Sequence, residues 1–193
     1  ENGGSLRYVL VQLPEPVGGP GFETIADVTK ERLRRSGKRV RDANPMFSGD
    51  LGFRVFKLDS TNIRPWDPDR ENLERTLDEA VEHIRPDRSE ADVLFELLLK
   101  LGLDLTVPIE KREIAGKEVH SIGAGALIAC LAKEIGAADV EPLALGIVEW
   151  HAAERPAGAS TIVFRDSALA DDVAKTNLTA ILEQHGLGNV RSL

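Results

Sequence analysis

The stretch Tyr8-Val9-Leu10-Val11-Gln12-Leu13 is a short apolar run that is closed by Pro14 and Glu15. It is too short for a helix and predicts a strand buried on both faces, as in a parallel sheet. A loop rich in proline and glycine follows, and Thr24 then caps a predicted helix. Residues 52–58 alternate apolar and basic side chains and predict a second strand. Strand, helix and strand form one βαβ unit, whose crossover should be right-handed.

Residues 62–69 contain two prolines and a tryptophan, which predict a domain boundary. The sequence pattern changes beyond this boundary. Residues 105–131 have a β-like pattern, with a hairpin turn at Ala115-Gly116-Lys117. Four further helices are predicted, at about 73–84, 90–101, 139–151 and 171–184, and two further strands, at 161–164 and 190–193. The helix at 90–101 is apolar nearly all round and is therefore expected to be buried. The sequence therefore predicts an α/β fold in two parts.

Composition sets limits on the class of protein. The chain has 193 residues, of which 42% are hydrophobic and 29% charged, as in an ordinary soluble globular protein. Its net charge of −8 argues against a compact basic nucleic-acid module, although a local basic face is compatible with it. Cys130, the single cysteine, can form no internal disulfide, which favours a reducing, cytoplasmic location. The longest apolar run is too short to span a bilayer, so no membrane association is expected.

Glu15 is the first candidate site residue, because it follows the predicted strand at the carboxyl edge of a parallel sheet. An acidic residue at that edge commonly accepts hydrogen bonds from the two ribose hydroxyls of a nucleotide-like cofactor. The alternative is an exposed loop acid. A complete cofactor site also needs the glycine turn of the preceding strand, which we therefore expect to lie before Glu1. Gly123-Ala124-Gly125 is no substitute, because it lacks the third glycine of such a loop.

A basic stretch concentrates positive charge in the predicted helix that Thr24 caps and continues to Arg41, beyond Gly37, where the helix is expected to end. Its members are Lys30, Arg32, Arg34, Arg35, Lys38, Arg39 and Arg41. They form either a solvated helix face or a contact for DNA phosphates, which would be electrostatic and blind to base sequence.

Three other features of the sequence give weaker evidence of function. Asn44-Pro45-Met46-Phe47 resembles the tetrapeptide with which amino-methyltransferases grip a flipped base, but it lacks the second proline and a preceding buried strand. Arg165-Asp166 follows a predicted strand and is either an active pair, an ion pair or a helix cap. No metal site is expected, because no histidine has a metal-ligand spacing to a second histidine or cysteine; the four are His83, His120, His151 and His185.

Together, several segments resemble the Mod subunits of type III restriction–modification systems, which are adenine-specific DNA methyltransferases. The resemblance follows the chain in order and covers essentially its whole length. The segments that carry it are residues 8–15, Thr24-Ile25-Ala26 through Lys30-Glu31-Arg32, residues 52–60, residues 96–103, Val163-Phe164-Arg165-Asp166 and Lys175-Thr176-Asn177.

This resemblance implies a Rossmann-like core that transfers methyl from S-adenosylmethionine to the N6 amine of adenine in DNA. In the family's order, the catalytic tetrapeptide, the target-recognition domain and the cofactor loop would all precede Glu1, so no catalytic residue is assigned in this chain. Glu15 matches the family's acidic position after the second cofactor strand and takes the ribose-hydroxyl role. The isolated chain is therefore expected to be inactive.

The resemblance also implies a division of the chain. Residues 1–60 would be the terminal βαβ portion of the methyltransferase core, and residues 61–193 a mixed α+β association domain. The implied partners are DNA, a restriction (Res) subunit and a second Mod subunit in a homodimer. Two alternatives stay open: a non-catalytic interaction module that docks a restriction subunit, and an unrelated small α/β enzyme with its site at Arg165-Asp166.

Overall fold

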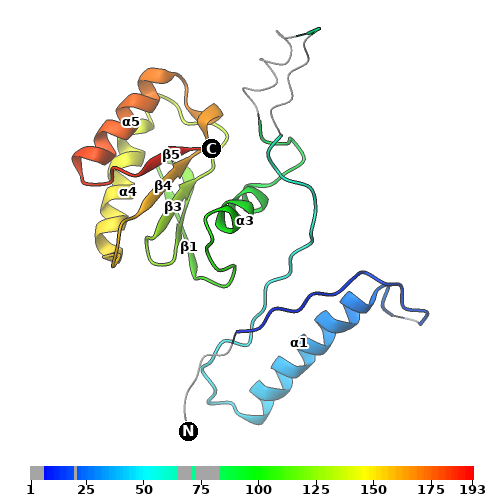
Figure 1. Cartoon of the computed structure of the whole chain (residues 1–193). Coiled ribbons are helices and arrows are strands. Elements are labelled where there is room, and N and C mark those ends of the chain that lie inside the picture. Colours follow the sequence, from blue (N-terminus) through cyan, green and yellow to red (C-terminus); the bar gives the residue numbers. More distant parts are fainter. Residues whose placement is uncertain (1–6, 20, 65–70, 73–82) are drawn as a thin grey trace. The chain divides into compact units, whose positions relative to one another are not determined.

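A computed structural model describes residues 7–19, 21–64, 71–72 and 83–193 of the chain (Figure 1). The chain divides into two compact units, a first unit of Glu1–Leu58 and a second unit of Asp59–Leu193.

The first unit is built on one long helix, α1 (Ile25–Ala43), which continues past Gly37, where the sequence predicted its end. Thr24 caps it as predicted: the Thr24 hydroxyl accepts from the backbone N–H of Asp27 at 3.2 Å, and the Asp27 carboxylate accepts from the N–H of Thr24 at 3.0 Å. These reciprocal bonds form a capping box, which satisfies two of the unpaired donors at the start of the helix. None of the residues of α1 is buried.

The two strands predicted at residues 8–13 and 52–58 are wrong for this chain, and so is the βαβ unit built from them. Both segments are described, and neither is a β-strand. Their apolar side chains are largely exposed, with Val9 84%, Val11 90% and Leu58 99% accessible. A strand of a parallel sheet is stable only between neighbouring strands and covering helices. The described part of the first unit offers no such sheet.

The second unit contains a five-stranded mixed sheet in the order β1-β2-β3-β4-β5. The neighbouring pairs β1–β2 and β2–β3 are antiparallel, whereas the pairs β3–β4 and β4–β5 are parallel. The turn between β1 and β2 has positive φ at Ala115 (51°) and Gly116 (72°), which is the left-handed geometry of a tight hairpin and confirms the predicted turn. The strands are β1 (Ile109–Ile114), β2 (Lys117–Ile122), β3 (Leu127–Cys130), β4 (Thr161–Phe164) and β5 (Val190–Ser192).

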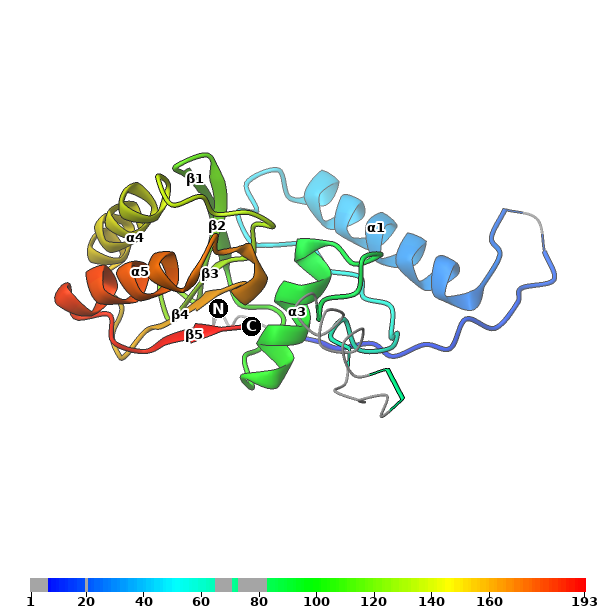
Figure 2. The same cartoon turned by 90° about the horizontal axis from the view of Figure 1, so that it is seen from above.

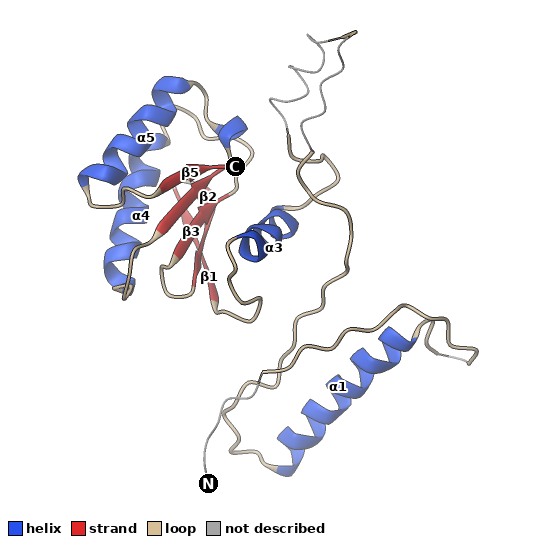
Figure 3. Cartoon of the chain, in the orientation of Figure 1, coloured by secondary structure: helices blue, strands red, loops and turns tan. Residues whose placement is uncertain are grey.

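Helices cover both faces of this sheet (Figures 1 and 2). On one face lie α4 (Val140–Glu154) and α5 (Asp172–Gln184), which connect β3 to β4 and β4 to β5. On the other face lies α3 (Glu90–Lys100), as the colouring by secondary structure also shows (Figure 3). The short 3-10 helix η1 (Asp166–Ala168) follows β4.

Two apolar cores follow from the alternation of side chains along the strands. The inward residues on the α4 and α5 side include Ile128, Ile162 and Phe164. Those on the α3 side include Leu127 and Val163. The layered arrangement confirms the α/β class.

The outcomes for the second unit's helices are mixed. The helices predicted at 90–101, 139–151 and 171–184 are present as α3, α4 and α5. Of α3, however, only Val93, Leu94, Leu97 and Leu98 are buried, and Leu99 is 62% exposed, so the prediction of burial all round was wrong. The helix predicted at 73–84 lies outside the described residues, apart from its last residues. Among the described residues, no helix is long and apolar enough to cross a membrane.

Candidate functional site

Glu15 is exposed and lies beside the start of α1. Its backbone carbonyl accepts from the N–H of Ile25 at 2.9 Å, and an isolated β-bridge joins Pro16 to Thr24. No ion pair within the described residues engages the Glu15 carboxylate, so both of its oxygens face solvent. Its predicted role at ribose hydroxyls stays a prediction.

All of the predicted phosphate contacts lie on α1, and the structure divides them into two groups. Lys30 Nζ lies 2.7 Å from Asp27, while Glu31 lies 2.8 Å from Arg35 Nε and 3.8 Å from an Arg34 nitrogen. The other cations are exposed, and no ion pair joins them to any described residue; they are Arg32, Lys38 and Arg39, together with Arg41.

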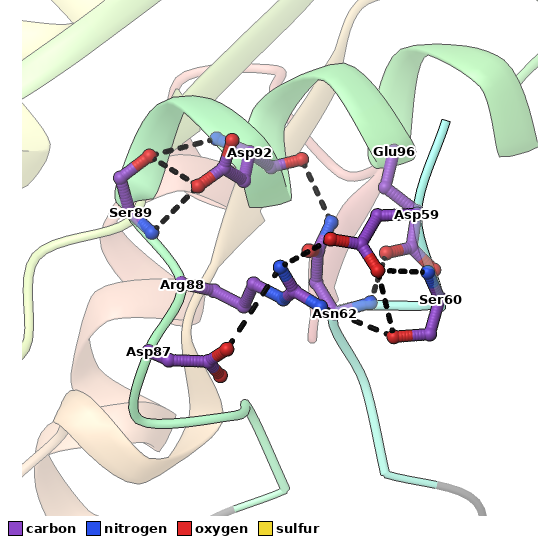
Figure 4. Close-up of polar contacts among 8 residues, drawn as sticks. All are labelled: Asp59, Ser60, Asn62, Asp87, Arg88, Ser89, Asp92 and Glu96. Carbon is purple, nitrogen blue, oxygen red and sulfur yellow. Dashed lines mark hydrogen bonds and ion pairs between the residues drawn. The ribbon is translucent and has the colours of Figure 1, made fainter. Parts of the chain in front are cut away.

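A polar cluster that the sequence did not reveal fastens the chain after Leu58 onto α3 (Figure 4). Arg88 lies in one half of it. A terminal nitrogen of its guanidinium is 3.2 Å from the Asp59 carboxylate, and the other donates to Ser60 Oγ at 3.1 Å. The backbone N–H of Ser60 donates to Asp59 at 2.7 Å and completes this half.

Glu96 lies in the other half of the cluster. Its carboxylate accepts from the backbone N–H of Asn62 at 2.6 Å and from the Thr61 hydroxyl, and it pairs with Lys100 at 2.9 Å. Asn62 Nδ2 donates to the backbone carbonyl of Asp92 at 2.9 Å. We call this cluster the Arg88 clasp; it comprises Asp59–Asn62 together with Arg88, Asp92 and Glu96.

The electrostatics of the clasp favour the charged forms of its groups. Burial raises the pKa of Glu96, but hydrogen bonds from Thr61, Asn62 and Lys100 outweigh it and lower that pKa to about 2. The N–H of Ser60 and the guanidinium of Arg88 lower the pKa of Asp59, and Asp59 in turn raises the pKa of Arg88. Because each carboxylate is already satisfied by protein donors, the clasp is suited to hold a segment in place rather than to bind a ligand.

The two halves of Arg165-Asp166 engage different partners. Arg165 is 7% exposed and donates from Nε to Ser167 Oγ at 2.9 Å. Asp166 forms an ion pair with Lys175 of α5. The structure therefore brings Asp166 together with Lys175, and the role of the Arg165-Asp166 motif stays a prediction.

Two serines and the cysteine of the second unit have structural partners or surroundings. Ser160 Oγ lies 2.8 Å from His151 Nε2, and Ser121 donates to Glu154 at 2.6 Å. Cys130 is buried, and burial raises the pKa of its thiol to about 11, so it stays protonated and unreactive at neutral pH. Within the described ranges, no group of three or more His, Cys, Asp or Glu side chains is placed to hold a metal ion.

Two shallow depressions lie elsewhere on the second unit. One, of about 360 Å³, is lined by residues of α4 and α5 and the loops before them, including Val140, Asp171 and Ile181. The other, of about 300 Å³, lies on the β1–β2 hairpin. Neither is lined by a candidate residue of the sequence analysis.

One curated protein provides an external comparison for this chain. Over 128 residues, this chain is 31% identical to the "Type III restriction-modification enzyme EcoP15I Mod subunit" of Escherichia coli. The match includes 62% of this chain. The chain is similar to part of a Mod subunit. It spans about a fifth of the length of that relative, 18%. No family model matches the chain.

The similarity to a Mod subunit agrees with the sequence resemblance at the level of a Mod-related region. In the structure, Glu15 and the basic stretch lie in the first unit and Arg165-Asp166 lies in the second. The Arg88 clasp was not predicted from the sequence. The contacts of the Asp59–Asn62 segment with Arg88, Asp92 and Glu96 join residues about thirty positions apart, as between Asp59 and Arg88.

Proposed function

We propose that this chain is the C-terminal part of a Mod subunit, a DNA adenine-N6 methyltransferase of a type III restriction–modification system. The observation that carries the proposal is the 31% identity to a Mod subunit over 128 residues. The parent protein would transfer a methyl group from S-adenosylmethionine to the N6 amine of adenine in DNA. The comparison supports a Mod-related role, and the activity itself is our proposal.

Glu15 is the residue of this chain that we assign to the cofactor. Its carboxylate is exposed, and its two oxygens match two vicinal ribose hydroxyls, so the side chain fits one polar contact of S-adenosylmethionine. The bound cofactor supplies the activated methyl group. Glu15 would orient the ribose, and no residue of this chain is assigned to the chemical step.

The exposed apolar segments of the first unit support a place in a larger core. Tyr8 to Leu13 and Val55 to Leu58 carry side chains that are mostly exposed here, including Val11 at 90%. Burying one such side chain contributes about 1.5–3 kcal/mol. We assign both segments to strands of the parent's methyltransferase sheet, where neighbouring strands would cover them. The basic stretch on α1 would contact DNA phosphates.

The second unit is assigned to subunit association. It has its own sheet with a core on each face, so it can present a surface without contributing to the cofactor site. The restriction (Res) subunit and a second Mod subunit are its proposed partners.

The test compares the 193-residue chain with the full-length gene product. Tritiated S-adenosylmethionine and duplex DNA should yield N6-methyladenine with the full-length protein and none with the chain alone. In the full-length protein, Glu15→Gln should raise the KM for S-adenosylmethionine by about tenfold, since one lost hydrogen bond to a charged group is worth about 1.5 kcal/mol or more. The KM for DNA should not change.

Glu23→Gln is the matched control, because Glu23 is an exposed acid of the same loop with no assigned role. It should leave both KM values unchanged. Methyl transfer by the isolated chain, or a full-length protein that forms no N6-methyladenine, would refute the proposal. The second result would favour the non-catalytic interaction module instead.

A further inference from the structure

The cations of α1 form two rows along opposite flanks of the helix. At 3.6 residues per turn, positions three and four apart lie above one another. The first row is Lys30, Arg34, Lys38 and Arg41, and the second row is Arg32, Arg35 and Arg39. The rows lie about 140° apart around the helix axis, and the first is about 16 Å long.

The ion pairs along α1 engage only some of its cations, and each row keeps at least one cation with no ion pair to any described residue. Asp27 and Glu31 engage Lys30, Arg34 and Arg35, all near the start of α1. Lys38 in the first row and Arg32 and Arg39 in the second are exposed and form no ion pair with any residue that the structure describes. An external anion can therefore meet at least one open cation in each row.

The charge of the chain is divided between its two units. Residues 1–58 hold ten Lys and Arg against seven Asp and Glu, whereas residues 59–193 hold fourteen against twenty-five. The net charge of −8 thus conceals a positive first unit whose cations are concentrated on α1. Such asymmetry is typical of chains that contact nucleic acid or a membrane surface.

The rest of α1 argues against a membrane surface. Interfacial helices bury a broad apolar face with bulky side chains. The side of α1 away from the cations carries Leu33 and Val40, but also Ser36 and Gly37. A Cβ at Gly37 would lie 3.6 Å from Leu51 Cβ, so this side already faces protein.

We propose that α1 binds duplex DNA with its two rows on the phosphates of the two strands that border one groove. The major groove of B-DNA is about 12 Å wide and admits a helix, and the phosphates of one strand border each of its two edges. Two rows on opposite flanks of one helix fit this arrangement, whereas one row would suffice for a single strand. The proposal rests on the proposed function for the choice of DNA, and it adds a duplex-specific, sequence-blind contact.

The test measures binding of the 193-residue chain to a fluorescein-labelled 20-base-pair duplex between 50 and 200 mM salt. Contacts with about four phosphates predict a plot of log affinity against log salt with a slope of about −3.6. The variant Arg32→Gln/Lys38→Gln/Arg39→Gln should reduce the magnitude of this slope by about 3, at roughly one unit per lost contact. Glutamine is a good helix former, so circular dichroism should show α1 unchanged.

A matched control removes the same charge from the second unit. Lys133→Gln/Arg155→Gln/Arg191→Gln changes three exposed cations and should leave both affinity and slope unchanged. Equal losses in the two triple variants would mean that net charge alone acts, and would overturn the proposal.

The two-strand geometry has its own test. Neutralising either row alone should abolish the preference for duplex over a single strand of the same sequence. The proposal fails if one row proves dispensable, if single strands bind as tightly as the duplex, or if vesicles with 30% phosphatidylserine bind and the duplex does not. Methylation by the full-length protein is measured separately, so loss of DNA binding by α1 and failure of the proposed function are distinguishable.

Discussion

At the scale of single residues, the Glu96 carboxylate in the Arg88 clasp makes the stability of the fold depend on pH. Its pKa of about 2 lies below the usual value of about 4.3 for an unfolded chain. Glu96 therefore stabilises the fold fully above about pH 4.5, and this contribution disappears as the pH falls toward 2. Glu96→Gln should lower the free energy of unfolding at pH 7 by about 1–2 kcal/mol, because the amide can accept at only one oxygen. Urea denaturation between pH 7 and pH 3 measures the difference, which should shrink toward pH 3.

Glu110→Gln is the control for this prediction, since Glu110 is exposed on β1. Its effect should be under 0.5 kcal/mol, which is typical of a surface substitution. A difference for Glu96→Gln that is the same at pH 7 and pH 3 would show that the clasp does not hold Glu96 in its charged form.

Single residues also show what the sequence reveals and what it conceals. The caps at Thr24 and Ser89 were predictable, because their partners Asp27 and Asp92 lie three positions away. The ion pair of Arg88 with Asp59 was not, because 29 positions separate the two and only the tertiary fold brings them together. The candidate site residue Glu15 could be proposed from its place after an apolar run, but its surroundings could not.

At the scale of secondary structure, the packing of α4 on β1 depends on Gly146. A Cβ at this position would lie 2.3 Å from Ile114 Cγ2, which is closer than two such atoms can approach. The overlap should cost about 1–3 kcal/mol, partly offset by about 1 kcal/mol from replacing glycine within a helix. Gly146→Ala should therefore destabilise the chain by up to about 2 kcal/mol, measured by urea denaturation.

A double-mutant cycle checks the cause of this loss. Ile114→Ala removes the opposing methyl group, so the two substitutions together should cost at least about 1 kcal/mol less than the sum of their separate effects. Gly158→Ala, where no atom lies within 4 Å of the added Cβ, is the control and should be nearly neutral. Additive effects of Gly146→Ala and Ile114→Ala would contradict the contact.

Elements were predictable where their neighbours lie in the same unit. The strand at Thr161–Phe164 has the bounds that the sequence predicted, because β3, β5 and two helices enclose it. Residues 8–13 have an equally strong β-pattern but form no strand. The sequence pattern indicates which side chains of a segment are suited to burial. The structure shows whether neighbouring strands and helices are present to bury them.

At the scale of the whole molecule, the apolar core is divided unequally between the two units. Every buried apolar side chain among the described residues lies at or beyond Ile84, in the second unit. Charge is divided in the opposite sense, with the positive excess in the first unit. The composition of the full chain averages these differences, so the net charge of −8 indicated neither the acidic second unit nor the basic helix.

This division predicts different protection against hydrogen exchange in the isolated chain and in the full-length Mod subunit to which we propose that it belongs. In the 193-residue chain, slowly exchanging amides should be confined to the second unit, because residues 8–13 and 52–58 have no strand partners that protect them. In the full-length protein, both segments should exchange at least 100-fold more slowly, since pairing within the methyltransferase sheet would bury their N–H groups. The amides of β3 and β4 serve as the internal reference and should exchange equally in both proteins. Fast exchange of residues 8–13 in the full-length protein would contradict their assignment to that sheet.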